Sequence, residues 1–492
     1  MTLLAGELDR IWAGDLFDRR AEADMLQAYL ESASNRALSR EDQRAFTLAI
    51  DAGYGEGKTF FLRRFAQHLA ASHPVAFVDA WADDIVDEPL TALAATLREA
   101  LDPIIQKSPA IADRWQTVLE KTGRIASIAS RGIFKRGLGL VFTSAAVEAA
   151  GEVFSGVGDK AEAAIQDDLK TSGADAVKAL EGGGSVAPGA LMQARIAAFQ
   201  DGKEAIEALK VSLEVLIAAL AGESLQAPVI IVIDELDRCR PTYAVKLLEE
   251  IKHLFDVPGL VFVFGMHGDQ LAHSVSGAYG PGFDGRAYLR RFIAREYRLK
   301  RPAPTPLVRF LLERSGLDTK RLSTDRVRDG LSLKQIQPAE AISWYARQQR
   351  LSLRDVYRLI DILQTCLALT RASLLMSYLL PLIIGRLQGR PSGSFEVPAS
   401  ATERITYVVA DMNGKTADVE AWAWADQLRS AARRTQHELV ERVNRNDRAS
   451  SVILDARSEN DLSLDPFANP RNYPDLLEAV GRFTDTTTEP EH

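Results

Sequence analysis

The sequence predicts an α/β protein whose mostly parallel, doubly wound sheet is interrupted by a helical insertion and followed by helical segments. Three observations predict this class. Short apolar strands alternate with helical segments over residues 46–300, as in a parallel sheet covered by helices. The segment APVIIVIDELDRC at 227–239 holds five consecutive apolar residues, which fits a strand buried on both faces. Residues 105–225 are rich in Ala, Glu and Lys, a composition that favours helix.

Composition sets the broad class of the protein. A chain of 492 residues exceeds one typical core, so we expect two or three packed units. Hydrophobic residues make up 46% and charged residues 26%, and the net charge of −8 argues against a protein that coats nucleic acid with its whole surface. Two cysteines and a start without a long apolar core favour the reducing cytoplasm. The seven scattered histidines show no metal-ligand spacing, so a zinc site is not expected.

The elements follow in order along the chain. The first 40 residues favour amphipathic helix, FTLAIDA at 46–52 a strand, and the residues after Lys58 a helix with one apolar face. Further strands are expected at 74–81, 227–234, 259–266 and 294–300, and the insertion contains a flexible break near 181–189. We therefore predict the following division: residues 1–104, first part of the α/β core; 105–225, helical insertion; 226–302, second part of the core; 303–390, a helical lid; 391–492, an accessory helical domain after a linker at 389–398, with a disordered end.

Two apolar runs raise the question of a membrane span. The eleven uncharged residues at 137–147 would reach about 16 Å as a helix, against roughly 30 Å of hydrocarbon. The thirteen residues at 373–385 contain Pro381. Both runs are expected to be buried helices, so the sequence argues against membrane attachment.

A phosphate-binding loop is predicted at the end of the first strand, where residues 52–59 read AGYGEGKT. Glycines let consecutive backbone N–H groups turn toward a phosphate at a helix N-terminus. Lys58 is expected to reach the β and γ phosphates, and the Thr59 hydroxyl to bind Mg²⁺. Ala52 stands where such loops usually carry a first glycine, and a methyl group is tolerated there. The expected nucleotide-binding residues are Gly53, Tyr54, Gly55, Glu56, Gly57, Lys58, Thr59 and Phe60.

An acidic pair completes the predicted site. Asp234 and Glu235 follow the five apolar residues of the buried strand. Asp234 is expected to hold Mg²⁺, directly or through water, and Glu235 to act as general base toward the attacking water. Two acids that only end a strand in solvent would look the same, but the phosphate loop on another strand favours the catalytic interpretation.

Longer segments resemble the KAP family of P-loop NTPases. IDELDRCRPTYAVKLLEEIKHLFDVPGLVFVFGMHGDQL at 233–271 is similar to its acidic motif, helix and following strand. FVDAWADD at 77–84 and AYLRRFIAREYRL at 287–299 are similar to two further family segments. The resemblance implies a sheet of the additional-strand class, with a strand between the loop strand and the Asp234 strand, and residues 74–81 fit that strand. Members often carry transmembrane helices inserted between loop and acidic motif, where this chain has 105–225.

Several residues keep two interpretations open. Asp237 and Arg238 match the family motif and either organise the strand end or a neighbouring subunit's site, or form a local ion pair. His267 follows a strand, where related ATPases place a polar residue that senses the γ phosphate, or it has no role. Arg290, Arg291 and Arg295 lie in a helix-like stretch, and an arginine there could neutralise the phosphoryl transition state in cis or across an interface. Arg291 is our candidate.

Two further basic features are also open. Arg354 begins an amphipathic helix and either reaches the nucleotide or lies on the helix surface. Residues 284–321 contain eleven Lys or Arg and four Asp or Glu, and fit either nucleic-acid contact or, preferably, a solvated basic face near bound phosphates.

The sequence thus predicts Mg²⁺-dependent ATP hydrolysis that drives a conformational switch or motor for an unidentified protein partner. No small-GTPase specificity motif is present, so ATP is preferred to GTP. The alternatives are a nucleotide-binding scaffold with little turnover and an ATPase stimulated by nucleic acid through 284–321. Bacterial members of the family often lie in mobile or phage-defence gene clusters, so the resemblance makes antiviral defence one context. Homo-oligomerisation stays open.

Overall fold

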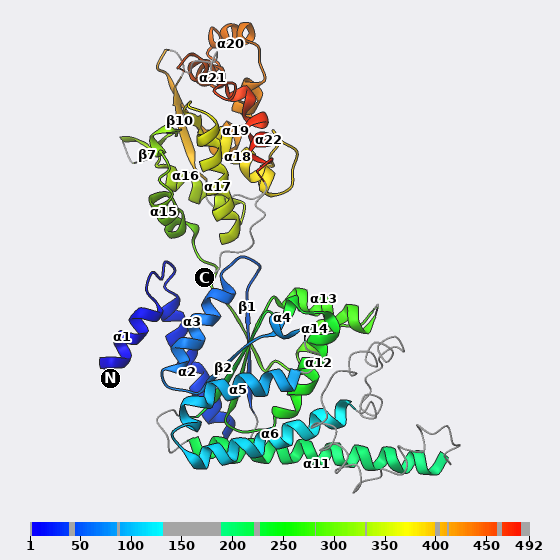
Figure 1. The fold of residues 1–492 in the computed structure, drawn as a ribbon. Helices are drawn as coiled ribbons and strands as arrows, with labels where there is room; N and C mark the ends of the chain where they lie inside the picture. Colours follow the sequence, from blue (N-terminus) through cyan, green and yellow to red (C-terminus); the bar gives the residue numbers. More distant parts are fainter. Residues whose placement is uncertain are drawn as a thin grey trace. The chain divides into compact units, whose positions relative to one another are not determined.

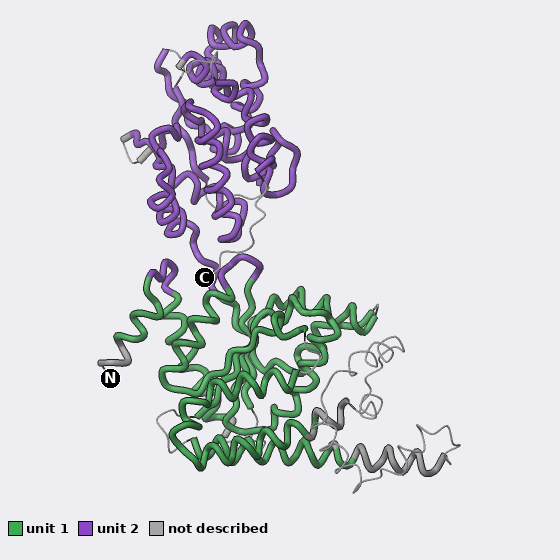
Figure 2. The backbone as a smooth tube through the Cα atoms, in the orientation of Figure 1, with its two compact units in different colours: residues 1–13, 19–52, 58–299 green, residues 14–18, 53–57, 300–492 purple. Residues whose placement is uncertain are grey.

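A computed structural model describes residues 2–38, 45–85, 89–130, 188–220, 227–280, 282–329, 332–398, 404–410, 413–459 and 465–483. The chain forms two compact units (Figure 2). Unit 1 comprises residues 1–13, 19–52 and 58–299, and unit 2 comprises residues 14–18, 53–57 and 300–492. The predicted break at 181–189 falls largely outside the described residues, which resume at 188, and the apolar run at 137–147 and the C-terminal tail at 484–492 lie wholly outside them.

Unit 1 contains a parallel five-stranded sheet in the order β2-β3-β4-β1-β5 (Figure 1). Its strands are β1 (Phe46–Asp51), β2 (Val75–Asp79), β3 (Val229–Asp234), β4 (Leu260–Met266) and β5 (Arg295–Arg298). Every residue of β3 and β4 is buried, as the run of five apolar residues in β3 predicts. The predicted strands and the parallel sheet are therefore confirmed.

The placement of one strand was wrong. Residues 74–81 were expected between the loop strand and the Asp234 strand, but β2 lies at the sheet edge, and β4 pairs with both β1 and β3. β2 alternates half-buried and buried residues, whereas β4 is apolar throughout and buried on both faces. The more uniformly apolar strand thus takes the interior position.

Helices cover both faces of this sheet. The helices of unit 1 are α1 (Thr2–Ile11), α2 (Arg19–Leu38), α3 (Lys58–Ala70), α4 (Ala80–Asp83), α5 (Pro89–Ile105), α6 (Pro109–Ser130), α11 (Pro188–Leu220), α12 (Pro241–Ile251), α13 (Gly268–Tyr279) and α14 (Gly285–Leu289), with short 3₁₀ turns at Leu236–Arg238 and Lys252–Leu254. One core lies between the sheet and α2 and α3, and the other lies between the sheet and α5, α6, α11, α12 and α13. The predicted apolar face of α3 is buried in the first core: Phe61, Leu62, Phe65 and Leu69.

The described part of the insertion consists of α6 and α11, which pack side by side (Figure 1). Trp115 of α6 and Leu213 and Leu216 of α11 are buried in the same core as β3 and α12. This packing anchors the insertion on the sheet. Among the described helices, none combines the length and apolar character needed to cross a membrane.

Unit 2 is mostly helical and includes small sheets. Its helices are α15 (Pro304–Arg314), α16 (Pro338–Gln348), α17 (Leu353–Leu369), α18 (Met376–Leu387), α19 (Ala421–Ala432), α20 (Gln436–Val443), α21 (Arg448–Glu459) and α22 (Tyr473–Val480), with 3₁₀ turns at Thr319–Arg321 and Pro470–Asn472. Its strands are β6 (Leu322–Ser323), β7 (Arg326–Asp329), β8 (Ser332–Gln335), β9 (Leu374–Leu375), β10 (Thr406–Ala410) and β11 (Thr416–Glu420). The second apolar run forms β9 and most of α18, which is buried as expected.

One core runs through unit 2. Leu359 of α17, Trp422 of α19 and Leu476 of α22 all belong to it, so residues 303–390 and 391–492 are packed together. Phe395, in the segment expected to be a linker, packs on Trp422 with ring centroids 6.2 Å apart. The C-terminal region was expected to be helical, but β10 and β11 form an antiparallel hairpin in it, consistent with the strand-favouring sequence TYVVA of β10.

Candidate nucleotide site

Residues 52–57 connect β1 to α3, as the loop sequence predicts. Gly55 and Gly57 have φ angles of 74° and 84°, in the left-handed region that favours glycine. The amide of Ala52 donates to the carbonyl of Met266 at 3.3 Å, which extends the contact between β1 and β4. The chain still follows the strand at Ala52, so a methyl group is accommodated at this position.

The loop residues 53–57 group with unit 2 and have contacts there. The Glu56 carboxylate accepts a hydrogen bond from the Gly53 amide at 3.1 Å and lies 3.3 Å from Nε of Arg301. The Gly55 carbonyl accepts a long hydrogen bond, 3.4 Å, from the backbone amide of Arg354 in the first turn of α17. The predicted lid arginine therefore contacts the loop through its backbone, and its side chain is exposed.

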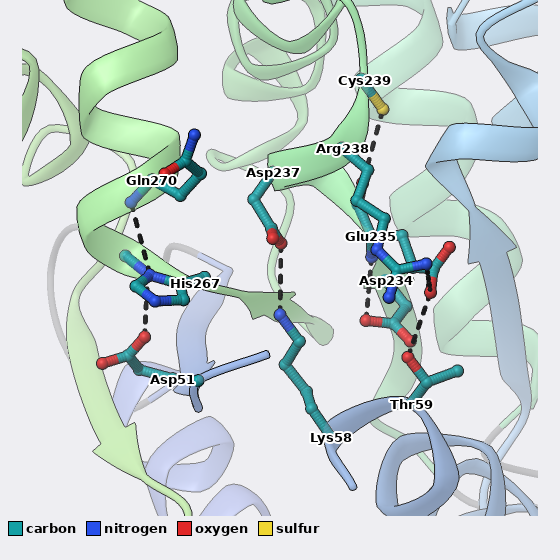
Figure 3. Close-up of polar contacts among 12 residues, drawn as sticks. Asp51, Lys58, Thr59, Asp234, Glu235, Asp237, Arg238, Cys239, His267 and Gln270 are labelled. Atoms are coloured by element: carbon teal, nitrogen blue, oxygen red, sulfur yellow. Dashed lines mark hydrogen bonds and ion pairs between the residues drawn. The ribbon is translucent and has the colours of Figure 1, made fainter. Parts of the chain in front are cut away.

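The first turn of α3 faces the acids after β3 (Figure 3). Nζ of Lys58 lies 3.2 Å from Oδ1 of Asp237, and the Thr59 hydroxyl donates to Oε1 of Glu235 at 3.2 Å. Residues 176 or more positions apart in sequence are thus brought together because β1 and β3 are parallel and end at the same edge of the sheet. All these side chains belong to unit 1.

The two predicted acids have different surroundings. Asp234 ends β3 and is buried, and its Oδ1 accepts a hydrogen bond from the Glu235 amide at 2.8 Å. Burial raises the pKa of Asp234 above its ordinary value, and the nearby Lys58 charge only partly offsets this. Burial also raises the pKa of Glu235, against the lowering effect of Arg238, whose Nη1 lies 2.9 Å from Oε1 of Glu235. Glu235 has a φ of 61°, so it lies in the sparsely populated left-handed region at the turn that follows β3.

The donor set fits a magnesium ion. Oδ2 of Asp234 is buried and accepts no hydrogen bond among the described residues, and the Thr59 hydroxyl is adjacent. Mg²⁺ prefers oxygen ligands and is commonly held by one or two carboxylates together with substrate phosphates and water. Within the described ranges, no cluster of three or more His, Cys, Asp or Glu side chains could hold a metal by itself. A magnesium ion held by Asp234 and Thr59 would take its other oxygen ligands from phosphates and water.

The aromatic residues of the predicted nucleotide set are exposed. Tyr54 is 45% and Phe60 43% accessible. The Arg64 guanidinium lies over the Phe60 ring, 4.2 Å from its centroid. One face of the Phe60 ring is thus next to a cation, and the roles of Tyr54 and Phe60 in nucleotide binding stay predictions.

Arg291 is not joined to this group in the described structure. Its guanidinium lies 5.7 Å from the Tyr288 ring centroid, and no described polar contact links it to Lys58 or Glu235. His267 caps α13, with its Nδ1 accepting from the Gln270 amide at 3.4 Å. The proposed roles of both residues stay predictions.

Many cations of the basic segment 284–321 have local partners. Arg286 pairs with Asp269, and Arg298 lies 3.9 Å from both Asp51 and Glu296. Arg321 donates to three backbone carbonyls, those of Leu367, Thr370 and Ala372. Both interpretations of residues 284–321, a solvated basic face and nucleic-acid contact, stay predictions.

Sequence reasoning missed two features of the site. Asp237 was expected to have an organising role or to form a local ion pair, and its pairing with Lys58, 179 positions away, has no local sequence signal. The second feature is Gly265, whose lack of a side chain leaves room for the Asp234 carboxylate. This feature does have a local signal, because Gly265 interrupts the apolar strand LVFVFGM and glycine in a strand often marks a close approach.

The comparisons with known proteins agree with this geometry. A family model described as the KAP family P-loop domain matches residues 20–370. A search of curated proteins found no match. The matched range contains the loop, the β3 acids and the intervening insertion, and it covers more than half of the 492 residues. This chain therefore belongs to the KAP family of P-loop NTPases, as its sequence motifs indicate.

Proposed function

We propose that this protein hydrolyses ATP with Mg²⁺ at the site formed by Lys58, Thr59, Asp234 and Glu235. The observation that carries the proposal is the meeting of the first turn of α3 with the acids after β3, the Thr59 hydroxyl lying 3.2 Å from Glu235. Family membership supports nucleotide binding and hydrolysis in general. The choice of ATP over GTP rests on the lack of a GTPase specificity motif in the sequence.

The sheet order supports a finer assignment to the additional-strand class of P-loop proteins. In that class a strand separates the loop strand from the acid-bearing strand, and β4 lies between β1 and β3 here. We extend the assignment to residues 303–390 as the lid, supported by the Arg354 amide contact with Gly55.

The chain's own residues supply most of the chemistry. The loop amides and the N-terminus of α3 bind the phosphates, and Lys58 neutralises charge on the transferred phosphoryl group. Glu235 accepts the proton of the attacking water, and burial favours this because it raises the pKa of Glu235. Bound Mg²⁺, held by Thr59 and Asp234, would stabilise charge on the phosphates.

Glu235 is engaged by other residues in the described arrangement. Its Oε1 accepts from Thr59 and lies 2.9 Å from Arg238. Before Glu235 can bind the attacking water, the Thr59 hydroxyl has to release the Glu235 carboxylate and turn toward the nucleotide and its metal ion. Nucleotide binding is therefore expected to move Thr59 away from Glu235, which suits a switch or motor acting on a partner, in antiviral defence or another context.

The Glu235→Gln variant distinguishes hydrolysis from the alternative, a nucleotide-binding scaffold with little turnover. Glutamine keeps an oxygen that accepts from Thr59 but cannot take a proton. We expect ATP affinity within threefold of wild type and turnover at least about 100-fold lower, the usual contribution of a general base. Glu99→Gln, on the exposed side of α5, is the matched control and should leave both unchanged. Equal turnover of wild type and Glu235→Gln would refute the hydrolytic proposal and support the scaffold.

A further inference from the structure

Asp237 is a buried acid whose described polar partner is the loop lysine. Its side chain is 1% exposed, that of Lys58 is 10% exposed, and their closest atoms lie 3.2 Å apart. The other carboxylate oxygen of Asp237, Oδ2, is buried and accepts no hydrogen bond among the described residues. The charge of Asp237 is therefore balanced chiefly by Lys58.

The turn after β3 puts Asp237 in this position. The left-handed Glu235 begins the 3₁₀ turn Leu236–Arg238, which the Arg238 amide closes on the Glu235 carbonyl at 2.9 Å. Asp237 and Lys58 point toward one another, while Glu235 and Arg238 lie toward Thr59 (Figure 3). The same short turn thus serves the two neighbouring residues of the loop separately, Lys58 through Asp237 and Thr59 through Glu235.

The phosphates of a nucleotide and the Asp237 carboxylate compete for the ammonium group of Lys58. Lys58 is the residue expected to reach the β and γ phosphates. When Lys58 turns to the phosphates, the buried Asp237 carboxylate loses part or all of its ion pair. An unpaired buried charge costs free energy, so Asp237 opposes the turning of Lys58 toward the nucleotide. A triphosphate offers Lys58 two phosphates and a diphosphate only one, so the opposition weighs more heavily against the diphosphate.

We propose that Asp237 is a positioning residue that holds Lys58 when no nucleotide is bound and draws it back after the γ phosphate leaves, thereby weakening the binding of the diphosphate product. The proposal rests on the proposed function, because it assumes that Lys58 binds phosphates. Asp237 itself touches neither phosphate nor water in this account; it acts through the lysine.

The test compares nucleotide affinities of wild type and Asp237→Asn, measured by calorimetry with ADP and with a non-hydrolysable ATP analogue. Asparagine keeps the shape of the side chain and removes the competing charge. We expect ADP to bind about tenfold more tightly and the analogue less than threefold more tightly. Asp256→Asn is the control, because it breaks the 3.0 Å ion pair with Lys210 before β4, away from the carboxyl ends of the strands, and should leave both affinities unchanged.

Thermal unfolding without nucleotide provides a second measurement that needs no binding. Lys58→Ala leaves Asp237 buried without its cation, so it should lower the Tm, and adding Asp237→Asn should restore much of the loss. An unchanged ratio of ADP to analogue affinity in Asp237→Asn, or no restoration of Tm in the double variant, would overturn the proposal. Failure of wild type to bind either nucleotide would instead overturn the proposed function, while the Tm comparison would still report whether the pair forms.

Discussion

Asp234 and Gly265 approach so closely at the ends of β3 and β4 that a Cβ atom added at Gly265 would lie 2.5 Å from Oδ1 of Asp234. The same atom would lie 2.2 Å from Cδ1 of Leu62 on α3. The space for the proposed metal-binding carboxylate thus exists because the neighbouring strand has no side chain at this point. Gly265 shapes the site without contacting the ligand.

Gly265→Ala should therefore displace Asp234 or Leu62. Overpacking in a close-packed core costs about 1–3 kcal/mol, so we expect a lower Tm together with a weaker Mg²⁺ dependence of nucleotide binding. Thermal unfolding and a Mg²⁺ titration measure the two effects. Gly277→Ala is the control: this helical glycine in α13 has open space around it, and alanine there should stabilise by about 0.5–1 kcal/mol. A Gly265→Ala protein with wild-type Tm and Mg²⁺ dependence would refute the steric argument.

The loop glycines should differ sharply from Ala52 in their tolerance of change. Gly57 has a φ of 84°, so Gly57→Ala would place a residue with a Cβ atom in the left-handed region. This costs roughly 1–2 kcal/mol and would distort the phosphate-binding amides. We expect at least a tenfold loss of ATP affinity. Ala52→Gly should change that affinity less than twofold, since Ala52 already fits the strand end. Comparable losses in both variants, measured by calorimetry, would show that the loop does not bind phosphate through its left-handed glycines.

Asp325 in unit 2 should make stability depend on pH. Its Oδ1 accepts from the Trp424 indole at 3.2 Å, its Oδ2 is buried without a described partner, and burial raises the pKa of the carboxyl. A raised folded-state pKa contributes stability that is complete below the unfolded pKa of about 3.9 and is lost as pH rises through the folded value. Asp325→Asn keeps the acceptor for Trp424 and carries no charge.

The Tm advantage of Asp325→Asn over wild type should accordingly be larger at pH 8 than near pH 4, close to the unfolded-state pKa of about 3.9. Titrations elsewhere in the chain are shared by the two proteins and cancel in the difference. A gap that stays constant across this range, or that narrows as pH rises, would contradict a buried carboxylate at this position.

The sequence was sufficient to predict the strands and the site's two halves, because each depends on a local pattern. The five apolar residues of β3 predicted a strand buried on both faces. Three loop glycines were expected to supply backbone freedom, and two of them, Gly55 and Gly57, have φ angles in the left-handed region. The buried face of α3 followed from helical spacing. In each case the residues near one another in sequence decide the structure.

Features that join distant segments were not predictable in this way. The order of β2 and β4 depends on which strand packs between β1 and β3. β4 is the more uniformly apolar of the two, but the pattern of each strand alone does not name its neighbours in the sheet. The Lys58–Asp237 pair joins residues 179 positions apart. Arg291 carries the charge expected of a catalytic arginine, yet its described contact is the Tyr288 ring. Charge alone did not identify its partner.

The central claim is that the loop and the β3 acids form a working hydrolytic site. The most direct measurement is phosphate release from ATP by the purified wild-type chain with Mg²⁺, beside Lys58→Ala. Turnover in wild type should require Mg²⁺ and should fall at least about 100-fold in the variant, as expected when a principal charge-stabilising group is removed. Phosphate release at equal rates from wild type and Lys58→Ala, or none from wild type while ATP remains tightly bound, would contradict the central claim.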